Sequence, residues 1–349
     1  MRYVGIDLHT TQLTVCYREE AGSEKLEAFR IDMVDKFISS LNADDKVAFE
    51  ATGNSMFLYK KLAEVVSLDN VIVVNTSRFK LISKSVKKTD KNDAKLLAEY
   101  LSKDMLPKAR LKNEIDSQIH ALIETRDNLV RMKTAFKNQV HNIFVKLGIK
   151  LKAKDVSSAK HLNKLLEAEE LNEIGKFQLQ LLIDNILHNG NEADKIEIKL
   201  MELQDYMEQI DNLTSICGIG LKSAMGIKAV IGDINEFEDP DKLVAYSGLC
   251  PRVSNSNETV SHGRITKMGN KLIRKLLVQC AWVSIRFNPI MKAQYDSLRK
   301  RKPAGVAIIA IARKLLIQIY WTLKYNWYFL NTANTEKEIR INGVTIQAA

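Results

Sequence analysis

The sequence predicts an α/β domain over residues 1–110, a helical, coiled-coil-like middle over 111–212, and a mainly α domain over 213–330, followed by a polar tail at 331–349. Two observations support this prediction. Short runs rich in Val, Ile and Tyr alternate with segments of helical spacing in the first part, which is the pattern of an α/β domain. From residue 116 onward, the apolar residues recur mainly at helical spacing.

The first part contains β-rich runs that are separated by turn residues or by helical segments. The two runs nearest the N-terminus, RYVGID and QLTVCYR, are separated by a short turn and predict a hairpin. Asn54 or Ser55 is a suitable N-cap for the first helix. The predicted elements are, in chain order, strands 2–7, 12–18 and 46–50, helix 54–66, strand 71–75 and helix 90–103.

The middle part has the spacing of long helices. A helix is predicted over 116–147, with Gly148 as its stop. A charged surface connection is expected at 150–170, and a break around 189–191, where the sequence reads Asn-Gly-Asn. A seam with a/d heptad spacing follows, and it predicts either a dimerisation arm or an intramolecular helical hairpin. The seam residues are Ile196, Leu200, Leu203, Met207 and Ile210.

The third part begins with a segment, 213–250, that resembles a helix-hairpin-helix element. Gly218-Ile219-Gly220 is expected to form a tight turn before a helix, where free backbone N–H groups suit a phosphate. Glycines at such a corner also serve backbone geometry alone. A last helical region is predicted from 304 to 330, and the tail is expected to be frayed.

The composition is that of a globular protein. Of 349 residues, 46% are hydrophobic and 27% are charged, which excludes a wholly disordered chain. The longest apolar run, 305–316, is interrupted by Arg313 and Lys314, so no membrane span is expected. The N-terminus reads as a strand and not as a signal peptide, which predicts a cytoplasmic, nucleoid-associated protein. The four dispersed cysteines are expected to be reduced thiols.

The positive charge is concentrated at the C-terminal end. The net charge is +10, and residues 251–349 carry 17 Lys and Arg against 4 Asp and Glu. A solvated surface explains some of this excess. Because the basic residues coincide with helices and glycine-containing loops, we expect a polyanion partner, most often nucleic acid.

Four acidic residues occupy positions from which they can converge. Asp7 and Glu50 each close a predicted strand, and Asp90 and Asp93 are spaced to share one face of a helix. Individually, such acids serve as caps or complement a helix dipole. Together they predict a site for a hard divalent cation, Mg²⁺ or Mn²⁺, of the kind that supports phosphoryl transfer.

This order of acids resembles the RNase H-like nuclease fold in its RuvC-like branch. The resemblance extends to the DEDD transposases of insertion-sequence family one hundred and ten and covers most of the chain. It rests on segments of both the first and the third part. They are YVGIDLHTTQLTV, VAFEATGN and KKTDKNDAKLLAEYL, then LTSICGIG, FEDPDKLVAYSGLCPRVSNSN, GRITKMGNKLIRKLL and AIARKLL.

The resemblance implies a serine nucleophile beside the four acids. The family serine follows a GL-x-P signature, here Gly248-Leu249-Cys250-Pro251, and corresponds to Ser256. Asn257 stands where the family has glycine, so Ser254 and Ser261 remain alternatives. The implied reaction cuts and rejoins DNA through a covalent phosphoserine intermediate, assisted by the metal that the four acids hold.

The resemblance also implies partners. These are the DNA of the element ends and the target, a noncoding bridge RNA that sets site choice, and further copies of the chain in a dimer or tetramer, in which acids and serine meet across subunits. Phosphate-binding residues are expected in the third part. They are Gly218, Gly220, Arg252, Arg264, Lys267, Lys271, Arg274 and Lys275.

Parts of the sequence also fit three other functions. A RuvC-like junction endonuclease would use the acids, Mg²⁺ and water, and would need no serine. GIDLHTT resembles a phosphate loop of sugar kinases and actin-like ATPases, but no further glycine-rich nucleotide loop follows it. A non-enzymatic DNA-binding protein is the third possibility, although all four acids and a candidate serine are present.

Overall fold

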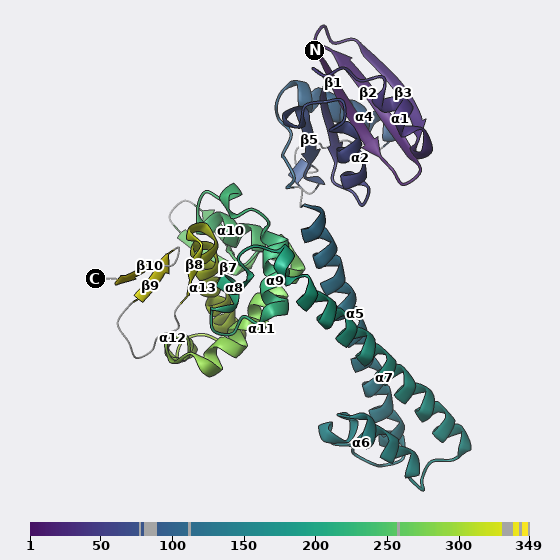
Figure 1. Ribbon diagram of the computed structural model, residues 1–349, viewed down its shortest axis with the longest axis vertical. Helices are drawn as coiled ribbons and strands as arrows, with labels where there is room; N and C mark the ends of the chain where they lie inside the picture. Colours follow the sequence, from purple (N-terminus) through teal and green to yellow (C-terminus); the bar gives the residue numbers. More distant parts are fainter. Residues whose placement is uncertain are drawn as a thin grey trace. The chain divides into compact units, whose positions relative to one another are not determined.

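The structure is a computed structural model that describes residues 1–76, 78–79, 89–110, 113–256, 259–329, 338–341 and 344–347. Residues 253–256, 259–262, 338–341 and 344–347 are described by their backbone alone. Internal contacts divide the chain into two units, Met1–Leu111 and Lys112–Ala349. The first is a mixed α/β sheet unit and the second is mostly helical (Figure 1). The domain boundaries expected at residues 212 and 330 remain predictions.

The N-terminal unit is built on a five-stranded sheet with the order β3-β2-β1-β4-β5. The first three strands form an antiparallel meander, and β4 and β5 run parallel to β1. Strand β3 was not predicted, because its sequence EKLEAFR is largely charged and suits the exposed edge of a sheet. The strands are β1 Arg2–Leu8, β2 Gln12–Glu19, β3 Glu24–Arg30, β4 Lys46–Glu50 and β5 Val71–Val74.

The two faces of this sheet are covered by different helices. Because side chains alternate along a strand, Val4 and Ile6 of β1 lie on one face, where α1 (Val34–Ile38) and α2 (Ser55–Leu62) complete a buried core. The opposite face packs against α4 (Asp90–Ser102). Helix α2 is shorter than predicted, and α1 was not predicted.

Helix α4 packs very closely on β1. A Cβ atom added to Gly5 would lie 2.2 Å from the carbonyl oxygen of Ala94 and 2.4 Å from the backbone nitrogen of Ala98. Cys16, which pairs with Gly5 in β2, is buried against the same two alanines. Small residues on both elements therefore bring the helix backbone against the sheet and determine where the first turn of α4 lies.

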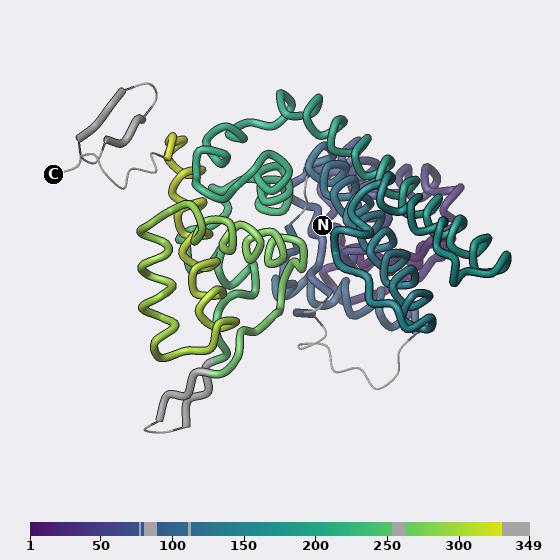
Figure 2. Tube along the Cα trace, turned by 90° about the horizontal axis from the view of Figure 1, so that it is seen from below, coloured from purple at the N-terminus to yellow at the C-terminus, as the bar shows by residue number. Residues whose placement is uncertain are grey.

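The second unit begins with two long helices, α5 (Glu114–Lys146) and α7 (Glu173–Glu202), which lie side by side (Figures 1 and 2). They are antiparallel, since the C-terminal end of α5 and the N-terminal end of α7 share one buried cluster. The connection expected at 150–170 is partly helical, with α6 at Ala159–Lys164, and it packs Leu162 into that cluster.

The break predicted at 189–191 is wrong, because α7 continues through it. Asn189 is buried, and its side-chain amide donates to the Asn185 carbonyl at 2.7 Å. Gly190 lies where α5 approaches: an added Cβ would meet Lys133 Nζ at 2.7 Å. Residues that favour a turn in isolation are thus kept helical by packing between two helices.

The heptad seam also has an intramolecular role. Helix α7 ends at Glu202, and α8 (Ile210–Thr214) follows after a short 3₁₀ turn. Leu200, Met207 and Ile210 are buried in the main core of the unit, so the structure shows the intramolecular alternative for this seam and not a continuous arm.

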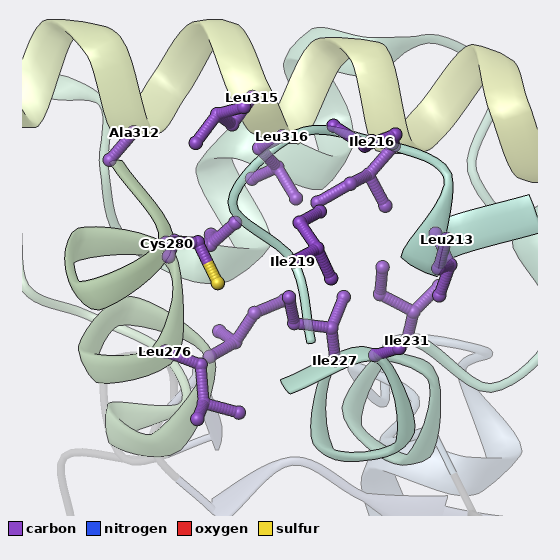
Figure 3. Close-up of a cluster of buried hydrophobic side chains, with 14 of the residues drawn as sticks. Leu213, Ile216, Ile219, Ile227, Ile231, Leu276, Cys280, Ala312, Leu315 and Leu316 are labelled. Carbon is purple, nitrogen blue, oxygen red and sulfur yellow. The ribbon is translucent and has the colours of Figure 1, made fainter. Parts of the chain in front are cut away.

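The main core of this unit is a bundle of apolar helices (Figure 3). Ile216 and Ile219 precede α9, Leu276 and Cys280 come from α11, and Leu316 comes from α13. The helices are α9 Leu221–Ile231, α10 Pro240–Ser247, α11 Lys271–Phe287, α12 Pro289–Arg299 and α13 Ala304–Tyr325. Within the described residues, α13 is the one helix long and apolar enough to cross a membrane, and 56% of its apolar window is buried, as expected of a core helix.

Two small sheets complete the unit. Strands β6 (Pro251–Ser256) and β7 (Thr259–Ile265) form an antiparallel hairpin. Strands β8 (Trp327–Tyr328), β9 (Glu338–Ile341) and β10 (Val344–Gln347) form a second sheet, so part of the tail predicted as frayed is paired.

Candidate metal centre

Asp7 and Glu50 lie at adjacent positions on one edge of the sheet. Strands β1 and β4 are parallel, with Ile6 opposite Phe49, so the acid that follows each of these residues reaches the same level. Gly5 and its partner Ala48 face α4, and alternation places Asp7 and Glu50 on that face too. The parallel register thus brings together two acids that are 43 positions apart.

The first turn of α4 supplies the other two acids. Thr89 caps the helix, and its hydroxyl accepts a hydrogen bond from the Asn92 backbone N–H at 3.3 Å. Asp90 and Asp93 both lie in this first turn. The carboxylate of Asp7 is mostly buried, with 17% of its side chain exposed, whereas that of Asp90 is 54% exposed. The group is therefore open to solvent on the side of Asp90.

His9, a residue of the turn between β1 and β2, joins this group. Its Nε2 atom lies 3.0 Å from Asp7 Oδ2 and 3.5 Å from Asp90 Oδ1. The backbone of His9 is held at both ends, since its N–H donates to the Gln12 carbonyl at 2.9 Å and its carbonyl accepts from Asn54 Nδ2 at 3.4 Å. The one feature of the sequence that indicates a role for His9 at the site is its position two residues after Asp7.

The electrostatics of Asp7 show that the acids influence one another. Burial raises the pKa of the Asp7 carboxyl above its ordinary value, and the negative charges of Asp90 and Asp93 raise it further, while His9 opposes this shift. Carboxylates that repel one another are stabilised by a cation placed between them.

The donor atoms of this group fit a divalent cation. Ligand atoms of Asp7, His9 and Asp90 all lie within 4.8 Å of one another. Oxygen donors from carboxylates suit Mg²⁺ and Mn²⁺. Glu50 and Asp93 belong to the same edge and the same helix turn but lie outside this compact group.

The candidate serines lie in the second unit, on the β6–β7 hairpin. In its register, Ser254 is opposite Ser261, and Ser256 is opposite Thr259 at the end of the hairpin. Asn257, the residue that departs from the family pattern, lies outside the described residues. The hairpin backbone thus holds all three serines within a short stretch, and the choice of Ser256 remains a prediction.

The basic residues expected to bind phosphate differ in their surroundings. Arg252, Arg264, Lys267 and Lys271 are exposed. Arg274 instead donates to the carbonyls of Ser247 and Gly269 at 2.9 and 3.0 Å, which links α11 to the end of α10.

Lys275, Gly218 and Gly220 were also expected to bind phosphate, and the structure shows what surrounds each of them. Lys275 pairs with Asp127 at 2.6 Å. Gly218 has a φ of 95°, and an added Cβ would lie 2.7 Å from the Cys280 carbonyl oxygen. Backbone conformation and close packing therefore both require a glycine at this position. Gly220 is the N-cap of α9, and its Cβ position is open.

Comparison with known proteins gives the family. The model of the DEDD transposase domain of IS110 elements matches residues 4–148, and the model described as Transposase IS116/IS110/IS902 family matches residues 210–296. The two matches lie in different halves of the chain and include, respectively, the acids and the candidate serines. A DEDD domain indicates dependence on a divalent cation, which agrees with the donor set described above.

Curated relatives agree with these matches. The chain is 25% identical over 333 residues to the transposase of element IS1328 from Yersinia enterocolitica, which covers 92% of this chain and 96% of that protein. It is 28% identical over 246 residues to the transposase of element IS1111A from Coxiella burnetii, covering 68% and 66%. A pilin gene-inverting protein from Moraxella bovis is 26% identical over 291 residues, covering 79% of each chain. The chain belongs to the IS110/IS116 family of insertion-sequence transposases.

Proposed function

We propose that this transposase cuts and rejoins DNA through a covalent serine intermediate, with a divalent cation held by Asp7, Glu50, Asp90 and Asp93. The observation that carries the proposal is the arrangement of these acids on one face of the sheet and the helix turn beside it. The cation, Mg²⁺ or Mn²⁺, would stabilise negative charge on the reacting phosphate.

The chain's own nucleophile in this proposal is the hydroxyl of Ser256. Its Oγ loses its proton and forms a bond to phosphorus while the bond from phosphorus to one sugar oxygen breaks. That oxygen leaves as a hydroxyl, taking up one proton for the one that Oγ has lost. The Oγ–phosphorus bond keeps the energy of the phosphodiester. A sugar hydroxyl of another strand can therefore reverse the step and release the serine without ATP.

Rejoining is supported by one of the relatives. The Moraxella protein is named for inverting a gene, and inversion of a DNA segment requires that each cut end be joined again. The same chemistry in this chain would serve both excision and insertion of an element. Water as the nucleophile would release the cut end with no covalent link to the protein, and rejoining would then need a separate attack by a sugar hydroxyl of that end.

The proposed partners follow from charge and from the family resemblance. The basic C-terminal part, with exposed Arg252, Arg264, Lys267 and Lys271, would bind phosphates of DNA and of a bridge RNA whose base pairing selects the sites. The acids and the candidate serines lie in different units of the chain. Their meeting across subunits of a dimer or tetramer is part of the proposal.

The test is a search for the covalent adduct. The full chain is incubated with element-end DNA, bridge RNA and Mg²⁺, denatured, and digested, and the nucleotide-bearing peptide is located by mass spectrometry. We expect an adduct on Ser256 that is lost in Ser256→Ala and in Asp90→Ala. Two exposed residues away from the proposed site provide matched controls, Ser297→Ala and Asp69→Ala, which should keep it.

Other outcomes would redirect the proposal. An adduct on Ser254 or Ser261 keeps the mechanism and changes the residue. Cleaved DNA without any adduct refutes the serine intermediate and favours a RuvC-like endonuclease that uses water. Binding without cleavage under all these conditions supports a non-enzymatic DNA-binding protein.

A further inference from the structure

The imidazole of His9 lies at a distance from the Asp7 and Asp90 oxygens that suits a third metal ligand. In an octahedral Mg²⁺ site with bonds of about 2.1 Å, neighbouring ligand atoms are about 3.0 Å apart. His9 Nε2 lies 3.0 Å from an oxygen of Asp7 and 3.5 Å from an oxygen of Asp90. The two distances from His9 are therefore near the spacing of neighbouring ligands around one cation, and the oxygens of Asp7 and Asp90 lie within 4.8 Å of each other.

We propose that His9 supplies a nitrogen ligand to the divalent cation between Asp7 and Asp90, and that this ligand makes the site favour Mn²⁺ over Mg²⁺. The inference rests on the proposed metal-dependent function and adds to it. The four acids alone form an all-oxygen site, which suits Mg²⁺ well. An imidazole nitrogen shifts preference toward transition metals, which bind nitrogen more strongly than Mg²⁺ does.

The backbone around His9 supports this role. The His9 N–H donates across the β1–β2 turn to the Gln12 carbonyl, and its carbonyl is bound by Asn54. Asn54 belongs to the loop that follows Glu50, so the loops after the two strand-end acids are connected through His9. This connection makes Asn54 a positioning residue for the imidazole.

The exposure of the group leaves room for the rest of a coordination sphere. The side chains of His9 and Asp90 are 53% and 54% exposed. Water or a phosphate oxygen can therefore occupy the remaining positions of a six-coordinate cation. A histidine that only hydrogen-bonds to Asp7 would occupy the same place without metal, so the two roles must be separated by detecting a nitrogen–metal bond.

The experiment uses the full chain without nucleic acid, with Mn²⁺ as the spectroscopic probe and Mg²⁺ titrated for comparison of affinity. Pulsed electron paramagnetic resonance measures the coupling between bound Mn²⁺ and nitrogen in protein with natural or ¹⁵N-labelled histidine. We expect a histidine nitrogen coupling in the wild type that is absent from His9→Ala. We also expect His9→Ala to weaken Mn²⁺ binding by at least about tenfold, with a smaller loss for Mg²⁺.

Controls and outcomes separate this inference from the proposed function. His188→Ala changes an exposed histidine of the other unit and should keep the coupling. Asn54→Ala should weaken the coupling or broaden it, since the imidazole loses its support. Bound Mn²⁺ without histidine coupling, or coupling that persists in His9→Ala, overturns the role of His9 and leaves the acid site standing. Failure of the wild type to bind Mn²⁺ at all refutes both.

Discussion

Replacing Gly5 by alanine is expected to separate the acids without touching any of them. The new Cβ would lie 2.2 Å from the Ala94 carbonyl oxygen, whereas real Cβ contacts stay above 3.0 Å. The atom that it meets belongs to the backbone, so no side-chain rotation relieves the overlap. Helix α4 must therefore retreat from β1 by at least about 0.8 Å at this point.

The retreat has two consequences of calculable size. Overpacking of a core by one methyl group costs about 1–3 kcal/mol in the free energy of unfolding. The same movement carries Asp90 and Asp93 away from Asp7, and a displacement near 1 Å in a reacting geometry lowers the rate by about 100-fold. We expect the loss of activity to exceed what the loss of stability explains.

Three measurements on one preparation check this prediction. Thermal unfolding gives the stability, Mn²⁺ titration gives the affinity of the site, and adduct formation with element-end DNA gives the activity. Gly53→Ala is the matched control, because its Cβ position has no neighbour within 4 Å. A Gly5→Ala protein that binds Mn²⁺ and forms adduct as the wild type does would refute the proposed dependence of the site on close helix packing.

Three further changes have expected outcomes. Burial raises the pKa of the Cys16 thiol from 9.0 to about 11, so between pH 9 and 10 the unfolded chain releases this proton first. This group should lower the free energy of unfolding by about 1 kcal/mol over that range, and urea titrations should show a fall smaller by that amount in Cys16→Ala; an equal fall in both proteins would refute the assignment. Arg274→Ala removes donors to two backbone carbonyls and should lower the free energy of unfolding in urea by about 1–3 kcal/mol. Arg264→Ala should leave stability unchanged and reduce the salt slope of DNA binding by about one. A salt slope for Arg264→Ala equal to that of the wild type would argue against a phosphate contact at Arg264. Gly190→Ala should stabilise α7 by up to about 1 kcal/mol, because the atom it meets is the movable end of Lys133; a lower melting temperature would mean that the lysine cannot move.

The pairing of the strand-end acids could be expected from the sequence, because the two strands that they close are buried and apolar. The predicted strand 46–50 coincides with β4, and the helix that begins at Asp90 was expected at 90–103. Local sequence patterns of this kind predict which residues lie at the ends of strands and helices. They contain enough information to place Asp7 and Glu50 at strand ends and Asp90 in a first turn.

The contacts of His9 could not be expected in the same way. Its distance to Asp90 depends on how closely α4 approaches β1, and that approach is determined by small residues whose effect appears only in the packed structure. The helix through Gly190 is a second example, since a turn-like dipeptide is overruled by a neighbouring helix. The reactive serine also could not be decided, because Ser254, Ser256 and Ser261 share one hairpin and differ by little in local sequence.

The register of β1 against β4 also limits how a gene for this chain can change in length. Asp7 and Glu50 face α4 because each stands an even number of residues after a partner, Gly5 or Ala48, that faces it. Adding or deleting one codon between such a pair would turn the carboxylate toward the opposite face of the sheet. Length changes between β2 and β3, at the turn containing Gly22, leave this parity intact. Copies of the element that acquire small insertions should therefore remain active or lose activity according to where the codon falls, even when the four acids are all still encoded.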